Sequence, residues 1–276
     1  MSSEGLILVT GGTGGLGHRV VPRLVAAGRT VRVLSRKPHA PDRAVEYMVG
    51  DLVTGVGVEA AVAGVDVVLH CAATGRIKKD TAQARNLVRA AQQAGVRHLI
   101  NISVVGADRI PVKSGLDRSM FGYFAGQRAV ESAFEESGIP WTNLRATQFY
   151  DGFMLVVLRG MSKLPVIPVP RGVRFQPVDT DDVAAELARL TLGEPVGEAP
   201  AIAGPKTYTL DELLRSYLKA VGKRRCLLPI RVPGAAAAAI RGGANLAPDR
   251  AVGTRTWEEY LADLSGQPST AARAAT

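Results

Sequence analysis

The chain has 276 residues, of which 46% are hydrophobic and 21% charged, with a formal net charge of +9. A chain of this size can bury a full core, as one enlarged α/β domain or as a main domain with a small C-terminal region. Its two cysteines, Cys71 and Cys226, do not make a disulfide framework and suit a reducing compartment. The longest apolar run, Pro233–Ile240, is far shorter than the ~20 residues of a membrane helix, so we expect no membrane partner.

The positive charge raises the question of nucleic acid binding. The basic residues are scattered, and their densest cluster is Lys223–Arg225, with no basic stripe interleaved with aromatic residues. The stretch before the first predicted strand has neither the basic region nor the apolar region of a secretory signal. We therefore expect a cytoplasmic monomer or homodimer with no nucleic acid partner, in which some basic residues serve an anionic small molecule.

The first half of the sequence alternates short β-rich runs with helical patterns, which is typical of a parallel sheet. The runs predict strands at residues 6–9, 30–34, 45–49, 65–71, 98–103 and 141–144. Helices are predicted from the glycine-rich segment to Gly28, over 81–94 and over 123–137. Right-handed crossovers then predict a doubly wound α/β fold with helices on both faces of the sheet.

From about residue 149 the pattern changes to proline-rich loops and short helices. Prolines between 165 and 177 predict loops, and helices are expected at 181–192, from the capping box Thr209–Glu212 to about Val221, and at 234–239. We expect residues 1–148 to form the sheet domain and residues 149–266 a smaller, interleaved region that covers the substrate cleft. Residues 267–276 are expected to form a flexible tail.

A glycine-rich segment, Thr10–Gly17, follows the first predicted strand and opens the first predicted helix. Gly11 permits a tight turn, Gly14 lets the backbone approach a diphosphate, and Gly17 lets the helix pack close to the strand. The strand–turn–helix context favours a dinucleotide site of Rossmann type over a merely structural turn. The residues expected to hold the cofactor here are Thr10, Gly11, Thr13, Gly14, Gly15, Leu16 and Gly17.

The end of the second predicted strand bears on the choice between NAD and NADP. An NAD-preferring domain usually places an acidic residue there, but this chain has Ser35, Arg36 and Lys37. Arg36 is suited to bidentate pairing with a 2′-phosphate, assisted by Ser35, Lys37 and Arg19, unless Arg36 is simply a solvated loop residue. We therefore predict that NADP(H) is preferred over NAD(H).

Eight segments carry a family resemblance that covers nearly the whole chain: Thr10–Gly17, Gly50–Leu52, His70–Ala73, Ile102–Pro111, Tyr123–Glu131, Leu144–Phe149, Gly243–Arg250 and Thr254–Glu259. In these segments the sequence resembles the atypical short-chain dehydrogenase/reductases, and more narrowly the NmrA-like NAD(P)-binding branch. The resemblance implies further cofactor contacts from Asp51, Leu52, Cys71, Ala72, Ala73, Ser103, Gln127, Thr147, Gln148 and Phe149. It implies that Phe149 borders the substrate cleft. Tyr150 follows this run and is expected to face the same cleft, and Tyr123 is a further candidate for substrate contact. Taken singly, Asp51 is equally suited to cap a loop, and the two alanines to plain packing.

The superfamily has a catalytic Tyr-x-x-x-Lys signature, and here the residue four positions after Tyr123 is Gln127. Residues i and i+4 share a helix face, so a lysine there can hold the ribose and favour the phenolate. A close cation typically lowers the pKa of such a group by ~1–3 units, but Gln127 supplies only hydrogen bonds. Arg128 does not replace the cation, because i+5 is rotated by about 140° from Tyr123.

The predicted catalytic residues are thus Tyr123, Ser103 and Gln127. Related extended members place the serine a couple of positions later, where this chain has Val104 and Val105. Tyr123 is either a proton donor or a packing or substrate-lining residue. Cys71 is expected to be a small buried hydrophobe rather than a nucleophile, and no side-chain cluster has metal-ligand spacing.

Three hypotheses remain from the sequence. The first is an NADPH-dependent reductase of a small carbonyl, enone or quinone, with neutral Tyr123 as proton donor. The second is a non-catalytic NADP(H)-binding sensor that reports cofactor state to a partner. The third is a non-redox isomerase or lyase that uses the same cleft. We favour the oxidoreductase. The identity of its small-molecule substrate is determined by loop side chains and does not follow from the fold.

Overall fold

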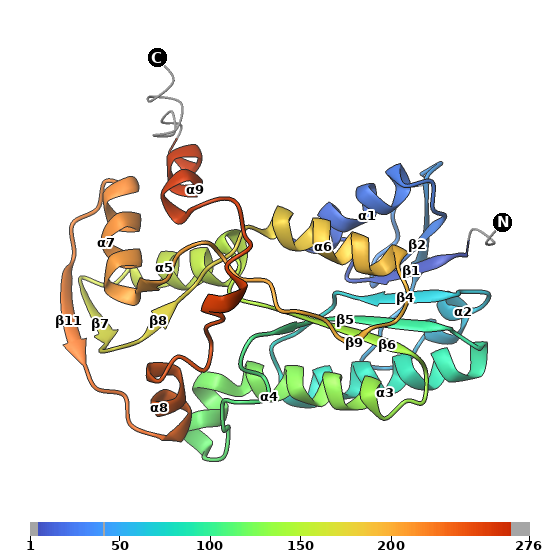
Figure 1. Cartoon of the computed structure of the whole chain (residues 1–276), viewed down its shortest axis with the longest axis horizontal. Coiled ribbons are helices and arrows are strands. Elements are labelled where there is room, and N and C mark those ends of the chain that lie inside the picture. The colour runs from blue at the N-terminus through green and yellow to red at the C-terminus, as the bar shows by residue number, and fades with distance from the viewer. Residues whose placement is uncertain (1–4, 41, 266–276) are drawn as a thin grey trace.

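The computed structural model describes residues 5–40 and 42–265, so the predicted tail at 267–276 lies outside the described residues (Figure 1). Its centre is a seven-stranded sheet in which every pairing is parallel. In spatial order the strands are β3 (Val45–Val49), β2 (Val31–Ser35), β1 (Ile7–Thr10), β4 (Val67–His70), β5 (His98–Val104), β6 (Trp141–Ala146) and β9 (Gly197–Glu198). The predicted doubly wound α/β fold is confirmed.

Helices cover both faces of the sheet, as Figure 1 shows. One face is covered by α1 (Gly17–Ala26) and α6 (Thr180–Leu192), and the other by α2 (Val58–Val62), α3 (Ile77–Ala94) and α4 (Gly115–Glu135). Strand β1 explains this layering, because its side chains alternate between the faces. Ile7 and Val9 pack in the core beneath α1, while Leu8 packs in the core beneath α3. All three are fully buried, as expected for a central parallel strand.

The C-terminal half builds a second core of its own. Its elements are the π-helix η1 (Tyr150–Met154), α5 (Leu155–Met161), β7 (Val166–Pro170), β8 (Arg174–Phe175), β10 (Tyr208–Thr209), α7 (Leu210–Ala220), β11 (Cys226–Ile230), α8 (Ala235–Arg241), the 3₁₀ turn η2 (Pro248–Arg250) and α9 (Trp257–Leu264). Met154, Leu213 and Trp257 lie in this core. Between these elements α6 and β9 return to the large sheet. No helix within the described ranges is long and apolar enough to cross a membrane.

Several elements differ from the sequence predictions. The helix predicted to begin at Tyr123 begins eight residues earlier, at Gly115, because Ser114 and Asp117 form a capping box. The proline-rich segment predicted as loop contains β7, which pairs with β11 in a two-stranded sheet. Both strands are edges, where proline is tolerated. Helices α2, α5 and α9 were not predicted, since five to eight residues give little helical periodicity.

A buried ion pair fastens α4 to the sheet. The side chain of Glu131 is fully buried, and its carboxylate accepts hydrogen bonds from Arg145 of β6 at 2.8 and 2.9 Å. Asn143 and Arg128 also donate to it, at 3.1 Å each. Although burial alone would raise the pKa of Glu131, Arg145, the Ser103 hydroxyl and Arg128 together hold it below its ordinary value. The pair thereby fixes the rotation of α4 about its own axis and its position along β6.

Replacing Glu131 by alanine should lower the free energy of unfolding by about 3 kcal/mol, because Arg145 is left partly buried without its partner. The control is Glu186→Ala, which removes a more exposed pair with Arg189 and should change stability by about 0.5 kcal/mol or less. Since the pKa of Glu131 is depressed, its contribution is present at neutral pH and fades as pH falls through the acid range. Denaturant unfolding at pH 7 and pH 4 measures both effects, and equal losses for the two variants would contradict this account.

Candidate functional site

The crossover direction of the chain reverses between β1 and β4. The connection after β1 runs to α1 on one face, and the connection after β4 runs to α3 on the other. Two parallel strands whose connections diverge leave a crevice at their carboxyl ends, which is where doubly wound sheets bind ligands. The glycine-rich turn after β1 and the loop after β4 border this crevice.

Gly11 brings these two segments into backbone contact. Its φ is +71°, and a Cβ atom at this position would stand 2.8 Å from both the Cys71 carbonyl oxygen and the Ala72 nitrogen. Gly17 is equally constrained, because its Cβ would stand 2.2 Å from the Gly11 carbonyl oxygen. Only glycine fits at either position without movement of the backbone. The structure therefore joins the predicted cofactor residues at 10–17 to those at 71–73.

The start of α1 is prepared for an anion. The backbone amides of Gly15 and Leu16 donate to no other group within the described part of the chain. The carbonyl oxygens of Gly14 and Gly15, in contrast, are bound by His18 at 2.9 Å and Arg19 at 2.6 Å. The first turn of α1 contains no acidic residue. Free amides together with the positive end of the helix dipole form the usual site for a diphosphate.

The carboxyl end of β2 holds a polar cluster. Ser35 is buried, and its hydroxyl lies 2.9 Å from His39 Nε2 and accepts from the Lys37 amide at 3.2 Å. The His39 ring stacks on Tyr47 of β3 with a centroid distance of 4.7 Å. Arg36 and Lys37 are exposed beside it. His39 was not predicted from the sequence, where its position four residues after Ser35 was the available signal.

Arg19 is placed differently from the sequence expectation. Its guanidinium pairs with Asp151 of η1 at 2.6 Å and with Asp181 of α6 at 3.3 Å. Arg23, one helical turn further, also pairs with Asp181. These contacts commit Arg19 to joining α1 with the C-terminal half, which argues against the assistance to a 2′-phosphate that we expected from it.

The predicted adenine residues follow β3. Asp51 accepts a hydrogen bond from the Val53 amide at 2.7 Å, so it caps its own loop, which was the alternative reading of this residue. Leu52 is buried, and Asn86 of α3 donates to its carbonyl at 2.8 Å. The loop is therefore anchored to α3, with Asp51 half-buried at its start.

Ser103 lies near the carboxyl end of β5, in register with Arg145 of β6. Its hydroxyl is buried and lies near the Glu131 carboxylate, whose pKa it helps to lower, although no hydrogen bond of good geometry joins the two groups. Tyr123, Gln127 and Glu131 are spaced by four along α4 and share one helix face. Because Glu131 binds Arg145, this face is turned toward the ends of β5 and β6. The structure thus directs the predicted catalytic residues to one region.

Tyr123 is 39% exposed, whereas Gln127 is buried. Protein around the phenol displaces water and, with a smaller effect of the Asp80 carboxylate, raises the pKa of Tyr123 to about 12. Arg128 does not oppose this effect, since it pairs with Glu131 and Glu135. The phenol is therefore protonated at neutral pH.

Asp80, in the first turn of α3, was missed in the sequence. It is 1% exposed, and its Oδ1 accepts from both the amide and the hydroxyl of Thr74 at 2.7 Å. Its Oδ2 is buried without a partner in the described structure and faces α4 at Gly126, where a Cβ would stand 3.1 Å away. Asp80 therefore links the loop after β4 to the helix that carries Tyr123.

The predicted site residues at 147–150, which follow β6, differ in their surroundings. Thr147 donates to the Gln176 carbonyl at 2.6 Å, Gln148 is buried with an unpartnered Oε1, and Phe149 is half-buried. Tyr150 is only 1% exposed, and its hydroxyl donates to the Arg255 carbonyl at 2.7 Å. It stacks in the C-terminal core, which argues against the substrate contact expected for it.

The crevice contains no activated thiol. Desolvation raises the pKa of Cys71 to about 12, so its thiol stays protonated at neutral pH. His70, whose Nδ1 lies 2.7 Å from the Thr10 hydroxyl, has its pKa lowered to about 4 by burial and is neutral. Within the described residues no group of three or more His, Cys, Asp or Glu side chains is arranged to hold a metal ion.

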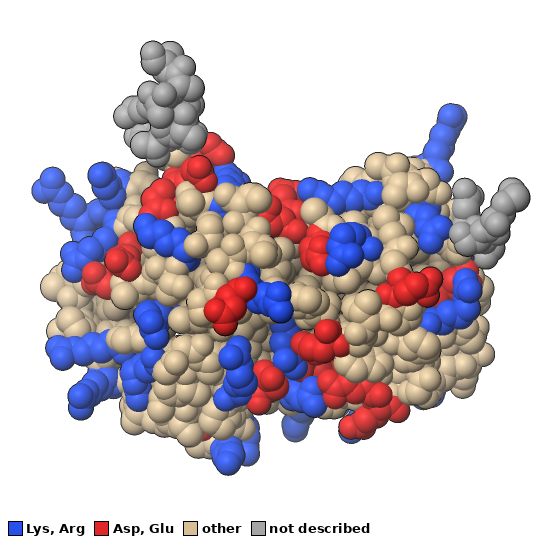
Figure 2. All heavy atoms as spheres, in the orientation of Figure 1, with Lys and Arg blue, Asp and Glu red and all other residues tan. Residues whose placement is uncertain are grey.

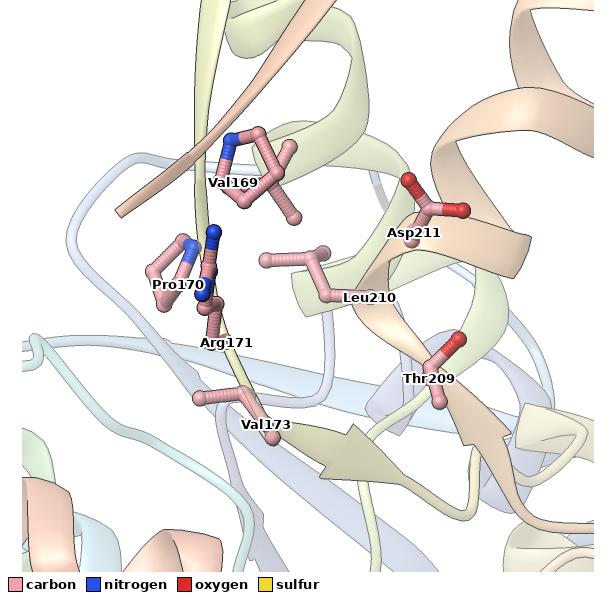
Figure 3. Close-up of a pocket in the computed structure, with 9 residues that line it drawn as sticks. Val169, Pro170, Arg171, Val173, Thr209, Leu210 and Asp211 are labelled. Carbon is pink, nitrogen blue, oxygen red and sulfur yellow. The ribbon is translucent and has the colours of Figure 1, made fainter. Parts of the chain in front are cut away.

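A separate pocket of about 350 Å³ lies in the C-terminal half (Figure 3). It is bordered by the β7–β8 turn and the start of α7, with Val169, Val173 and Leu210 among its lining residues. Arg171 and Asp211 supply its charged groups. None of the predicted cofactor residues lines it.

These features define a dinucleotide-binding α/β protein, and comparisons with known proteins agree. Residues 11–188, more than half of the chain, match the NAD(P)H-binding family, to which this chain belongs. This membership fits the expected relationship to the atypical short-chain dehydrogenase/reductases.

Among its relatives, the (4-alkanoyl-5-oxo-2,5-dihydrofuran-3-yl)methyl phosphate reductase of Streptomyces griseus subsp. griseus is 31% identical over 79% of this chain and 74% of that protein. The triphenylmethane reductase structure of Citrobacter sp. is 23% identical, covers 94% of this chain and 98% of its own, and has a TM-score of 0.73. The Escherichia coli quinone oxidoreductase QOR2, complexed with NADPH, is 21% identical, covers 96% of each chain and has a TM-score of 0.70. General oxidoreductase character follows from the reductase relatives, and the two structures show the shared fold.

Replacing Asp80 by asparagine should lower the pKa of Tyr123 from about 12, because it removes the negative charge that contributes to the shift. Asparagine keeps an oxygen to accept from Thr74, so the loop contact should survive. The measurement is pH titration by NMR of ¹³C-labelled tyrosine, with Tyr123→Phe assigning the signal. The control is Asp66→Asn, just before the amino end of β4, which should leave this pKa unchanged; an unchanged value in Asp80→Asn would contradict the electrostatic role.

Proposed function

We propose that the protein is an NADP(H)-dependent reductase of the NmrA-like type that acts on a small organic carbonyl, enone or quinone. The observation that carries the proposal is the crevice bordered by the glycine-rich turn, with a neutral phenol on the facing helix. The reductase named among the relatives supports the reaction class. We also propose a cytoplasmic monomer or homodimer, in keeping with the two free cysteines.

The residues at the turn fit the diphosphate of a dinucleotide. The free amides of Gly15 and Leu16 would hold its oxygens, and Ala72 and Ala73, on the loop that Gly11 contacts, would lie along the ribose. Gln127 and the buried hydroxyl of Ser103 would lie toward the nicotinamide end. Thr147, Gln148 and Phe149 would border the same end, as the family resemblance implies.

In the proposed reaction, NADPH supplies a hydride when it is bound. Tyr123 donates the proton from its hydroxyl to the substrate atom that gains negative charge, with Ser103 orienting that atom. A proton donor must carry its proton, as an ordinary phenol does at neutral pH, and burial raises the pKa of Tyr123 further. The absence of a lysine at position 127 therefore impairs reduction less than oxidation, which needs the phenolate.

The preference for NADP(H) is supported by the end of β2. Arg36 and Lys37 are exposed there, next to Ser35, and no carboxylate occupies these positions. A guanidinium can pair bidentately with a phosphate, whereas a ribose 2′-hydroxyl favours an acidic partner. The NADPH named in the Escherichia coli neighbour is consistent with this preference.

One observation favours a second candidate, a binding protein without turnover. Gln127 replaces the cation of the catalytic signature, and Arg145, the nearby cation, is already bound to Glu131. A sensor of cofactor state needs the dinucleotide site but not a proton donor. The two candidates differ in whether NADPH is consumed when a substrate is present.

Replacing Tyr123 by phenylalanine should lower kcat by about 100-fold and leave NADPH affinity unchanged, because only the proton donor is removed. The assay follows NADPH absorbance at 340 nm with a panel of quinones, enones and carbonyl compounds. Tyr260→Phe, in the C-terminal core, is the control and should retain full activity. Full activity in Tyr123→Phe would exclude the donor role, and no consumption by the wild type with any compound would favour the sensor.

Replacing Arg36 by glutamate should weaken NADPH binding by about 10- to 100-fold, since it exchanges a charged hydrogen-bond donor for a repulsive carboxylate. NADH binding should change by less than about threefold. Lys163→Glu makes the same charge change at an exposed site in the C-terminal half and controls for net charge. Affinities measured by calorimetry that fall equally for both cofactors would show that Arg36 does not contact the 2′-phosphate.

A further inference from the structure

A second pocket, of about 590 Å³, lies at the end of α7 and along the loop to β11. Its lining residues are Arg215, Leu218, Lys219, Gly222, Lys223, Arg224, Arg225 and Leu227. Five of the eight are basic and none is acidic. Lysines and arginines project from this end of the molecule, at the left of Figure 2. None of the predicted cofactor residues lines this pocket.

The local sequence explains how the basic residues converge. Helix α7 buries one apolar face, including Leu214 and Leu218, so Arg215 and Lys219 stand on its outer side one turn apart. The helix ends at Ala220, Gly222 just beyond its cap has a φ of +64°, and the Lys223 amide donates back to the Leu218 carbonyl at 2.9 Å. This closure turns the chain so that residues 223–225 return beside the helix.

Two of the cations are held in place. Arg225 is half-buried and donates to the Ser162 carbonyl at 3.1 Å and to the Arg224 carbonyl at 2.9 Å. Arg215 pairs with Asp211, one turn earlier on α7, at 2.7 Å. Part of the pocket is therefore ordered before any ligand arrives, which reduces the entropy lost on binding.

The pocket carries more positive charge than neighbouring acidic side chains neutralise. Once Asp211 is set against Arg215, four cations remain, and Lys219, Lys223 and Arg224 have no ion-pair partner among the described residues. The carboxyl end of a helix favours nearby cations, but its dipole is equivalent to only about half a unit of negative charge. Helix capping thus accounts for a small part of this cluster.

We propose that this pocket binds an organic phosphate or diphosphate. Arginine forks and lysine ammonium groups are the side chains that bind phosphate oxygens, and two or more negative charges match the unpaired cations. The volume is within the range of small-molecule sites, and Leu218 and Leu227 provide an apolar wall for the organic part. The phosphate can belong to a free metabolite or to a lipid headgroup, because Val221 and Leu228 are exposed beside the pocket.

The test uses inorganic pyrophosphate as the probe and the full chain with excess NADPH, so that the nucleotide site does not take up the probe. Calorimetry compares the wild type with the double variant Lys223→Ala/Arg224→Ala. The control is Arg85→Ala/Arg89→Ala, which removes two exposed cations one turn apart on α3. Loss of charged contacts predicts at least about tenfold weaker binding in the pocket variant, and less than about twofold in the control. NADPH affinity should be unchanged in both.

A second arm distinguishes the two sources of phosphate. The protein is sedimented with vesicles of equal parts phosphatidylglycerol and phosphatidylcholine. A lipid headgroup is identified if the wild type sediments with the vesicles, if pyrophosphate reverses this, and if the pocket variant does not sediment with them. Pyrophosphate binding without sedimentation identifies a free phosphate. The proposal is overturned if the wild type binds no pyrophosphate, if pocket and control variants weaken equally, or if a DNA duplex binds where pyrophosphate does not.

Discussion

The backbone contact between Gly11 and the loop at Cys71–Ala72 is the constraint on which the candidate site depends. A side chain at Gly11 would collide with that loop at 2.8 Å, so the turn and the loop can meet only if position 11 is glycine. Their meeting aligns the ends of β1 and β4 and leaves the amides at the start of α1 open. The dinucleotide site is thus a consequence of close packing between two pieces of backbone.

The placement of the predicted catalytic residues depends on charged side chains in α4 and next to it. Glu131 and Arg145 fix the helix against β6, and that attachment turns Tyr123 and Gln127 toward the same edge of the sheet. Where the catalytic signature has a lysine, this chain has the neutral amide of Gln127. The carboxylate of Asp80 lies across the interface between α3 and α4. Neither feature favours the phenolate of Tyr123. In the proposed reaction this arrangement suits donation of a proton better than its removal.

Local patterns were enough to predict six of the seven strands of the sheet and the glycine turn, because buried parallel strands and phosphate-binding turns have strong short-range signatures. The start of α4 was misplaced, since its polar first turn shows no apolar stripe and only its capping box marks it. Asp80, His39 and the pairs of Arg19 depend on contacts between distant segments, which periodicity does not report. Tyr150 was assigned to the cleft by its neighbours in sequence, but packing with Trp257 and Tyr260 decides its place.

The most direct test of the central claim is a crystal structure of the protein with NADPH. The account predicts the diphosphate on the amides of Gly15 and Leu16, the 2′-phosphate at Arg36, and the nicotinamide C4 facing the side of the crevice that carries Ser103 and Tyr123. NADPH bound away from the glycine turn, or with its nicotinamide turned from Tyr123, would contradict it.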